Sequence, residues 1–391
     1  MKQFDFCLPT KLMFGPGSVA RLPEAVSGLG RKALLVTYAD GSMRTAGTLD
    51  KVVGLLEEAQ ITVVVDEGVE PSPRTEYVDR LAQVVRTEGC SFVVGLGGGS
   101  AMDAAKAIAV AATNNTSIVE YLLGGANPLL LGAQDALPIV TVTTTSGTGS
   151  EVTCVAVLTD DNGHRKEGVI HRSLYPTVSV VDPELMLTMP SGVTAVTGVD
   201  ALFHALEAFL SRGANPWSDL VAKEALRLIT ANLETAFRDG SNLEARANMA
   251  WACTLAGIAF DNANCVAIHA LGQAIGSHTD ATHGKTSAAL GPAYLRYTYQ
   301  SDPARYAAIA RLIGARGEGL SEMELAASSG DVLQGFLARF NLDITASSLG
   351  VTETMIPAIV EETFQTMRPL LDSSLATLDE TDAAKILRLS L

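Results

Sequence analysis

Four side chains have the types and the spacing of a single divalent-metal site: Asp200, His204, His269 and His283. Asp200 and His204 are four residues apart in an apolar helical pattern, so a helix would place both on one face, one turn apart. On one continuous helix His269 and His283, fourteen residues apart, would be separated by about 21 Å. The intervening segment 276–284 contains loop-forming Gly, Thr and Asp, which predicts a turn that brings the two histidines together. Three imidazoles and a carboxylate suit Fe(II), Zn(II), Mn(II) or Co(II).

The predicted secondary structure that must position these residues differs between the two halves of the chain. Up to about residue 188, β-branched runs alternate with helical stretches, which predicts βαβ units and a parallel sheet. The predicted strands are 32–38, 61–68, 91–99, 137–145, 154–160 and 177–185, and the predicted helices between them are 47–59, 75–89 and 100–114. Beyond about residue 191 the pattern is helical only, over 194–210, 216–237, 243–260 and 302–315. We therefore predict an α/β domain at 1–188 and a helical, metal-binding domain at 189–391.

Charge and cysteine usage exclude several classes of protein. The chain carries 28 Lys plus Arg against 43 Asp plus Glu, a formal net charge of −15, which argues against nucleic acid or an anionic membrane as a main partner. The five cysteines are scattered and never form CxxC, so no disulfide framework is expected and a cytoplasmic location fits. We find no signal-peptide pattern and no apolar run of about 18 residues that would span a membrane.

Two loops that follow predicted strands are candidates for holding a nucleotide. Gly97, Gly98, Gly99 and Ser100 lead from a strand into a helix, where glycine lets the backbone approach a phosphate and the helix start favours an anion. The second loop, 143–150, is rich in threonine and glycine, and its hydroxyls could hold ribose or phosphate. Each loop alone could equally be a structural turn. Two such loops at the ends of parallel strands favour the nucleotide interpretation.

Two acidic residues flank these loops. Asp103, three residues after Ser100, fits a helix-capping role. Asp40 directly follows the strand 32–38, where a carboxylate can accept hydrogen bonds from a ribose diol and repel a 2′-phosphate. Asp40 therefore favours NAD(H) over NADP(H), and the alternative is a residue of a surface turn.

Taken together, these motifs resemble the iron-dependent (group III) alcohol dehydrogenases, a family that includes lactaldehyde reductases and butanol dehydrogenases. The resemblance covers essentially the whole chain. GGGSAMDAAKA resembles the family's pyrophosphate loop, TTTSGTGSEVT its second cofactor loop, and GVDALFHALEAFLS with AIHALGQAIGSHTDATHG its metal signature. The resemblance implies a Rossmann-like N-terminal domain, a helical C-terminal domain as in the dehydroquinate synthase-like architecture, and a homodimer or larger homo-oligomer.

The resemblance also implies roles for individual residues. It makes Asp200, His204, His269 and His283 the metal ligands, with Fe(II) the favoured ion and Zn(II) or Mn(II) as alternatives. It implies cofactor contacts by Gly97, Gly98, Gly99, Ser100, Thr144, Thr145 and Lys166. We add Thr148 of the second loop, Asp103, and Ser72, which stands where members often carry asparagine in a PxP turn.

Three further side chains near the predicted ligands have open roles. Gln273 stands where many family members carry a histidine, and glutamine cannot relay a proton at neutral pH. The proton would then come from water, from the cofactor ribose, or from another group such as His278. Glu207, one turn past His204, is compatible with orienting that histidine and equally with a solvated helix face.

Lys285 lies two residues after His283, where family members usually have an apolar or small residue. A cation beside the site would suit a carboxylate, sulfonate or phosphonate group on the substrate. The alternative is a solvent-facing lysine at the start of a helix.

These observations lead to the hypothesis of a metal-dependent, NAD(H)-linked alcohol dehydrogenase or aldehyde reductase that acts on a small aldehyde, with an anionic aldehyde (carboxylate, sulfonate or phosphonate) as one class of substrate. One alternative is a related chemistry on a phosphorylated substrate, as in glycerol-1-phosphate dehydrogenase, or that of dehydroquinate synthase. A second is a non-catalytic protein that binds NAD or a metal. The four-ligand pattern with its fourteen-residue histidine gap favours the alcohol dehydrogenases.

Overall fold

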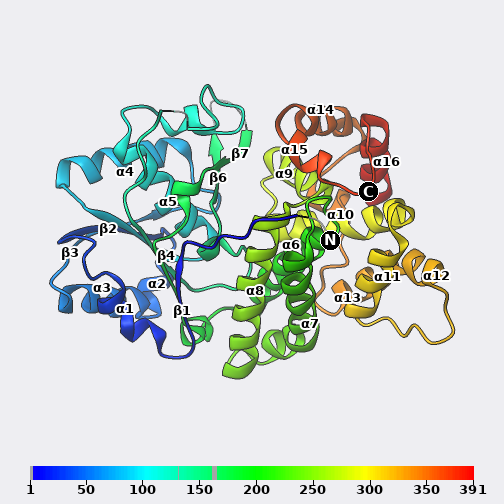
Figure 1. Ribbon diagram of the computed structural model, residues 1–391, viewed down its shortest axis with the longest axis horizontal. Coiled ribbons are helices and arrows are strands. Elements are labelled where there is room, and N and C mark those ends of the chain that lie inside the picture. The colour runs from blue at the N-terminus through cyan, green and yellow to red at the C-terminus, as the bar shows by residue number, and fades with distance from the viewer. Residues whose placement is uncertain (1–2, 131, 161–164) are drawn as a thin grey trace. The chain divides into compact units, whose positions relative to one another are not determined.

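The structure is a computed structural model that describes residues 3–130, 132–160 and 165–391. It divides into two compact units, one formed by Cys7–Met189 and the other by Pro190–Leu391 together with the start of the chain up to Phe6. Every strand of the described residues lies in the first unit, and the second unit is built from helices (Figure 1). The predicted fold class, an α/β unit followed by helices alone, is confirmed.

A parallel six-stranded sheet forms the centre of the first unit, in the order β1-β8-β5-β4-β2-β3. Its strands are β1 (Lys11–Phe14), β2 (Lys32–Tyr38), β3 (Thr62–Val69), β4 (Phe92–Gly97), β5 (Ile139–Thr143) and β8 (Val178–Val181). From β2 the chain passes to β3 on one side and then crosses to β4 on the other, so the strand order reverses between β2 and β4. At such a switch point a crevice opens outside the carboxyl ends of the strands, where nucleotides commonly bind.

Helices cover both faces of this sheet (Figure 1). Successive side chains of a strand point to opposite faces. In β2, Leu34 and Val36 belong to the core under α4 (Thr75–Glu88) and α5 (Gly99–Thr113). Ala33 and Leu35 belong to the core under α1 (Leu22–Ala25) and α3 (Thr48–Glu58). Burial on both faces explains the continuous apolar runs of these strands in the sequence. The short α2 (Ser42–Thr45) directly follows β2.

The sequence pattern did not predict β1 and β7, and it assigned β6 to the parallel sheet, whereas β6 lies in a separate two-stranded sheet. β1 has only four residues and is an edge strand paired with β8. β6 (Val155–Asp160) was expected among the strands of the parallel sheet, but it pairs antiparallel with β7 (Arg165–Ile170) in a separate two-stranded sheet. β7 begins RKEG and lacks the β-branched pattern, so its strand conformation depends on its pairing with β6 rather than on its own sequence.

The second unit contains eleven helices among the described residues. They are α6 (Ser191–Phe209), α7 (Pro216–Arg238), α8 (Leu243–Ala263), α9 (Ala267–Thr279), α10 (His283–Thr298), α11 (Pro303–Leu312), α12 (Glu322–Ala327), α13 (Ser329–Ala338), α14 (Ile356–Thr366), α15 (Arg368–Asp372) and α16 (Glu380–Ser390). From Gly198 to Phe209 α6 is buried on every side, and it packs against α7, α8 and α10. No helix of the described residues has the length and apolarity needed to cross a lipid bilayer.

The segment between the last two predicted ligands differs from the expected loop over 276–284. α9 continues to Thr279, and α10 begins at His283, so only residues 280–282 form the turn. Asp280 takes the left-handed conformation there, with φ of 55°. Gly284 is not a loop residue, because it lies in the first turn of α10, where a Cβ atom would come within 2.4 Å of the Val196 carbonyl oxygen on α6. Glycine therefore allows α10 to approach α6 closely.

We predict that Gly284→Ala destabilises the protein, because the added methyl group meets backbone that cannot turn aside. The expected loss in the free energy of unfolding is about 1–3 kcal/mol, as for other overpacked sites. Gly192, in α6 with no atom within 4 Å of an added Cβ, is the matched control. Gly192→Ala should be neutral or stabilising. Equal effects of the two changes in denaturant unfolding would contradict the close contact at Gly284.

Candidate metal centre and nucleotide loops

α6, α9 and α10 bring the four predicted metal ligands together. Asp200 and His204 lie one turn apart on α6, with Asp200 Oδ2 3.9 Å from His204 Nδ1. His269 is in the first turn of α9, and these three residues are 5–7% exposed. His283 begins α10, and its Nδ1 lies 2.9 Å from Asp200 Oδ1. The His269 ring lies 4.7 Å from the His204 ring and 4.1 Å from the His283 ring, measured between ring centroids.

The arrangement of nitrogens in this cluster fits a divalent cation. His204 Nε2 and His269 Nε2 face each other at 3.1 Å, which places two imidazole nitrogens where one ion could accept both lone pairs. His283 Nε2 is buried and, among the described residues, has no hydrogen-bond partner. A buried polar atom without a partner costs roughly 1–3 kcal/mol, and coordination of an ion would remove that cost. The donors, three imidazoles and a carboxylate, suit borderline divalent metals.

Glu207 is the structural support of His269. Its side chain is completely buried, which excludes the solvated helix face, and it contacts His269 rather than His204. Glu207 Oε1 accepts a short hydrogen bond from His269 Nδ1, and Oε2 accepts from the backbone N–H groups of Val266, at 2.9 Å, and of His269, at 3.2 Å. With Nδ1–H donated to Glu207, the His269 Nε2 lone pair is directed at His204.

Burial sets the charge states of this pair. Burial lowers the pKa of His269 well below its ordinary value, and the neighbouring His283 and His204 lower it further. The His269 imidazole is therefore neutral at neutral pH, the form that a metal ligand requires. Burial also raises the pKa of Glu207 well above its ordinary value, against the effect of the two backbone donors. Both shifts therefore disfavour charge on this buried pair, and Asp200 supplies the carboxylate of the proposed donor set.

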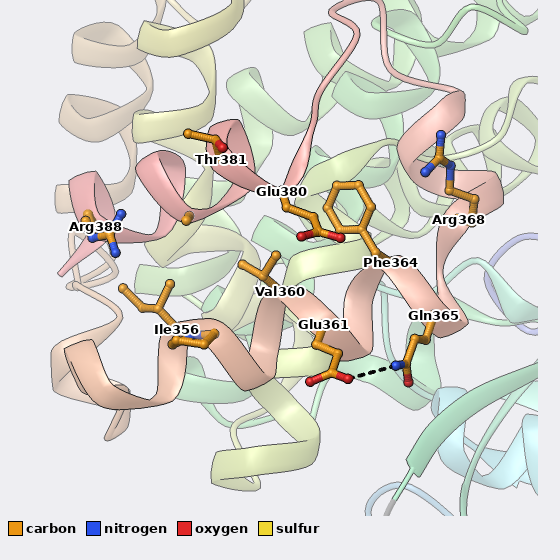
Figure 2. Close-up of a pocket in the computed structure, with 11 residues that line it drawn as sticks. Ile356, Val360, Glu361, Phe364, Gln365, Arg368, Glu380, Thr381 and Arg388 are labelled. Carbon is orange, nitrogen blue, oxygen red and sulfur yellow. Dashed lines mark hydrogen bonds between the residues drawn. The ribbon is translucent and has the colours of Figure 1, made fainter.

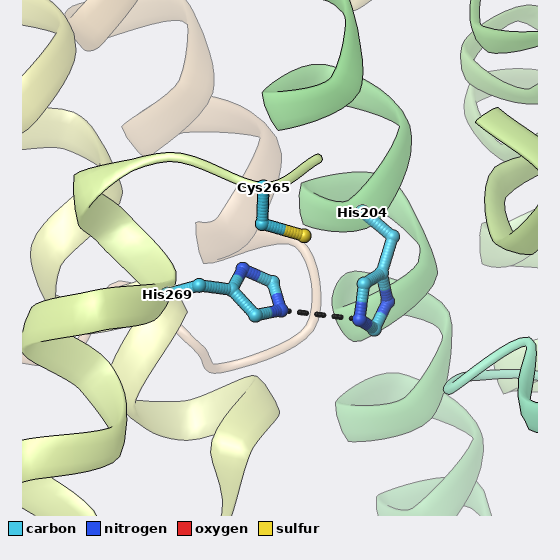
Figure 3. A group of neighbouring side chains, drawn as sticks. All are labelled: His204, Cys265 and His269. Atoms are coloured by element: carbon cyan, nitrogen blue, oxygen red, sulfur yellow. Dashed lines mark hydrogen bonds between the residues drawn. The ribbon is translucent and has the colours of Figure 1, made fainter. Parts of the chain in front are cut away.

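Cys265 is a member of this cluster that sequence reasoning missed. The Cys265 Sγ and one ring nitrogen each of His204 and His269 all lie within 4.8 Å of one another, and Figure 3 shows the thiol above the two rings. The side chain is 4% exposed, and burial raises the pKa of the Cys265 thiol well above its ordinary value, with the Glu207 and Asp200 carboxylates adding to the effect. The only signal in the sequence is a cysteine four residues before a predicted ligand.

Gln273 and His278 extend from the same helix as His269. Gln273 lies one turn after His269 on α9, and its Oε1 is buried without a hydrogen-bond partner in the part of the chain that the structure describes. His278 lies nine residues after His269, about 13 Å along the helix axis, because α9 continues through this segment. Its Nε2 contacts Glu362 Oε2 at 2.9 Å. Of the two, Gln273 is therefore the one placed beside the ligands.

Lys285 is exposed in the first turn of α10. Two residues along a helix correspond to about 200° around its axis, so Lys285 and the ligand His283 point to different faces of α10. Within the described residues no carboxylate pairs with its ammonium group.

The two predicted nucleotide loops contact each other in the first unit. A Cβ atom at Gly98 would lie 2.5 Å from Thr145 Oγ1, and one at Gly99 would lie 2.5 Å from Thr148 Cγ2. The Thr144 N–H donates to the Gly97 carbonyl oxygen at 2.9 Å, and Gly97 has a φ of 150°. Only glycine permits this close packing, so the turn after β4 and the loop after β5 form one surface beside the start of α5.

Hydrogen bonds tie further predicted residues to this surface. The Ser72 N–H donates to Ser100 Oγ at 3.3 Å. The expectation that Asp103 caps α5 is wrong, because the helix begins after Gly98 without a side-chain cap. Instead, Asp103 accepts hydrogen bonds from Ser150 Oγ at 2.6 Å and from the Val157 N–H at 3.0 Å. It therefore holds the second loop and β6 against α5.

Asp40 and Lys166 lie at other positions of the first unit. Asp40 is exposed beyond β2, next to the switch point, and its Oδ1 accepts from the Ser42 N–H at 2.8 Å. This bond belongs to a turn that starts α2 and is compatible with both interpretations of Asp40. Lys166 is half-buried on β7, opposite Thr159 of β6.

A groove on the second unit is separate from the metal centre. It lies among α14, α15 and α16, has a volume of about 810 Å³, and is lined by residues that include Phe364, Arg368, Glu380 and Arg388 (Figure 2). None of the predicted site residues lines it.

Comparison with known proteins covers both units. The family model described as iron-containing alcohol dehydrogenase matches residues 9–183, and the C-terminal model of the same family matches residues 194–390. A 1,3-propanediol dehydrogenase of Citrobacter freundii is 40% identical, with 92% of each chain covered. An NAD-dependent methanol dehydrogenase of Bacillus methanolicus is 33% identical, with 98% of this chain and 99% of the relative covered.

Solved structures agree over the full length. A 1,3-propanediol oxidoreductase superposes with a TM-score of 0.93 at 37% identity and covers 100% of both chains. A sulfoacetaldehyde reductase from Bifidobacterium kashiwanohense, in complex with NAD⁺, gives a TM-score of 0.86 at 28% identity, with 100% of this chain and 99% of that chain covered.

We predict that Glu207→Gln weakens metal binding by roughly 10- to 100-fold, the range typical when an outer partner of a ligand is lost. Both oxygens of Glu207 accept hydrogen bonds from N–H groups. Glutamine replaces one of these oxygens with an NH2 group, which cannot accept such a bond, so His269 would lose its fixed orientation. Competition against a chromophoric chelator measures the affinity. Glu234→Gln, at an exposed ion pair on α7, is the control. Unchanged affinity in Glu207→Gln would show that Glu207 does not orient the ligand.

Proposed function

This chain belongs to the iron-containing alcohol dehydrogenase family, and we propose that it interconverts a short-chain alcohol and its aldehyde at a metal centre formed by Asp200, His204, His269 and His283. The observation that carries the proposal is the convergence of these side chains from three helices, with a buried, partnerless His283 Nε2 among them. The family assignment favours this activity over the related phosphate-substrate chemistries and over a non-catalytic binding role.

The residues of the centre suit this reaction. When bound, a divalent cation would supply a Lewis acid for the carbonyl oxygen, and the nicotinamide cofactor would supply or accept the hydride. Glu207 holds His269 as a neutral ligand with its lone pair directed inward. Gln273, one turn away, offers an amide with a buried oxygen that can hydrogen-bond a substrate hydroxyl but cannot titrate, so we expect the proton to come from solvent or from the cofactor ribose.

We propose Fe(II) as the native ion, supported by the family to which the chain belongs. Zn(II) and Mn(II) remain alternatives because the same donors accept them. The proposed cofactor is NAD(H) rather than NADP(H). Asp40 lies beyond β2 beside the switch point, and its anchored carboxylate would repel a 2′-phosphate. The relative from Bacillus methanolicus is named as NAD-dependent, which agrees with this preference.

Two classes of substrate follow from different observations. The relatives named for 1,3-propanediol favour a small uncharged alcohol or hydroxyaldehyde, and the uncharged amide of Gln273 suits a hydroxyl group. A small anionic aldehyde is the second class, because one structural neighbour is named as a sulfoacetaldehyde reductase. Lys285 would have to reach its anionic group from a face of α10 other than the one that carries His283. We propose the uncharged class as the principal substrate and the anionic class as the second candidate.

We predict that metal-stripped protein does not oxidise NADH, and that Fe(II) restores turnover under anaerobic conditions. The substrate panel is propanal, butanal, lactaldehyde, 3-hydroxypropanal, succinic semialdehyde and sulfoacetaldehyde, each with NADH and with NADPH. His269→Ala should lose metal-dependent turnover and still bind NADH, as followed by cofactor fluorescence. Near-wild-type turnover in His269→Ala would show that the ligand assignment is wrong, and faster turnover with NADPH would refute the role of Asp40.

A separate prediction concerns Lys285. If Lys285 contacts an anionic group of the substrate, Lys285→Ala should lower kcat/KM for sulfoacetaldehyde and succinic semialdehyde roughly tenfold or more, and leave propanal unchanged. Lys51→Ala, on the first unit, is the control for loss of one positive charge. Equal changes for charged and uncharged aldehydes would eliminate the anionic candidate.

A further inference from the structure

We propose that Cys265 gives this metal centre a second donor set, in which its thiolate joins His204 and His269 to bind a thiophilic divalent ion, above all Zn(II). The inference rests on the proposed metal centre and concerns which ion that centre retains. The first donor set consists of Asp200, His204, His269 and His283. In the second set the Cys265 thiolate takes the place of Asp200 and His283 and binds the ion together with His204 and His269. Because both sets use the same two histidines, one ion occupies one set at a time.

The distances allow this coordination with small side-chain movements. In tetrahedral Zn(II) sites with Zn–S of about 2.3 Å and Zn–N of about 2.0–2.1 Å, neighbouring donor atoms are separated by roughly 3.3–3.6 Å. The Nε2 atoms of His204 and His269 are 3.1 Å apart, and Cys265 Sγ lies within 4.8 Å of one ring nitrogen of each histidine. Figure 3 shows the sulfur over the line that joins the two nitrogens. One ion near that line would bind both nitrogens, and a rotation of the Cys265 side chain toward it would bring in the sulfur.

The backbone that presents Cys265 is held in place. Glu207 accepts the N–H of Val266, directly after Cys265, and also orients His269, so one carboxylate positions both donors. The Cys265 N–H donates to Asn264 Oδ1 at 3.1 Å, and Asn264 Nδ2 donates to Ser373 Oγ at 3.0 Å. The thiol is a free, buried cysteine. It is therefore directed into the cluster by the fold and is not a flexible surface residue.

Ligand chemistry separates the two donor sets. Thiolate is a soft donor that strongly favours Zn(II) and Co(II) over Mn(II), whereas carboxylate with imidazole also suits Fe(II) and Mn(II). On binding, the S–H bond of Cys265 breaks, an S–metal bond forms, and the proton passes to solvent without a change in oxidation state. The expected consequence is that Zn(II) resists exchange by Fe(II) in this protein because of one side chain.

The test uses metal-stripped full-length protein as wild type, Cys265→Ser and Cys253→Ser. Cys253 is a buried cysteine of α8 that lies outside the cluster and serves as the matched control. Co(II) is the spectroscopic probe. Wild type and Cys253→Ser should show visible d–d bands together with a near-ultraviolet thiolate-to-Co(II) charge-transfer band, and Cys265→Ser should show d–d bands alone.

Affinity provides the second measurement. By chelator competition, Cys265→Ser should lose Zn(II) affinity by at least the roughly 10- to 100-fold typical of an outer partner, with Mn(II) affinity unchanged. Co(II) d–d bands in wild type without the charge-transfer band would overturn the role of Cys265 and leave the proposed centre standing. Absence of stoichiometric Co(II) binding in wild type would overturn both. If Cys265→Ser fails to fold, the presence or absence of the charge-transfer band in the wild-type spectrum still tests whether the Cys265 thiolate binds Co(II).

Discussion

The buried carboxylate of Glu207 is the interaction on which the metal centre depends. An acid in a dry interior is costly unless its oxygens are satisfied, and here the imidazole of His269 and two backbone N–H groups satisfy them. These bonds attach the start of α9 to α6, and so place His269 opposite His204. The missing side chain of Gly284 lets α10 approach the Val196 carbonyl oxygen of the same helix closely. α6 therefore works as the fixed reference to which the other ligands are attached.

In the first unit, close backbone packing and buried hydrogen bonds likewise position the proposed cofactor loops. Its sheet reverses strand order between β2 and β4, and the two proposed nucleotide loops follow the carboxyl ends of the neighbouring strands β4 and β5. Glycines let the turn after β4 contact the threonine loop after β5, while Asp103 ties that loop and β6 to α5. The helix N-terminus and the backbone, rather than charged side chains, would then receive the pyrophosphate. This fits a protein whose net charge is −15.

The chemistry of the centre is shaped by groups that do not titrate easily. Burial keeps His269 neutral, and Gln273 replaces an ionisable side chain with an amide, so neither supplies a proton at neutral pH. In the proposed centre a bound divalent ion would then supply the Lewis acid. Which ion binds decides the strength of the Lewis acid, and a thiol that competes with a carboxylate and an imidazole gives the fold a means of selecting it. In this proposal, metal selectivity and catalysis would be linked through His204 and His269.

Local pattern in the sequence determined the parallel sheet, the glycine turn, and the pairing of Asp200 with His204, because helix and strand periodicity depends on neighbouring residues alone. It also identified His269 and His283 by residue type. The partner of Glu207, the presence of Cys265 in the cluster and the role of Asp103 were decided only by tertiary structure. The hydrogen bonds of Asp103 and Glu207 join residues that are 47 and 62 positions apart in the sequence. Periodicity indicates which face of a helix is buried, but it does not identify the residues that this face contacts. For the same reason β7, which is a strand through its pairing with β6, could not be recognised from its own residues.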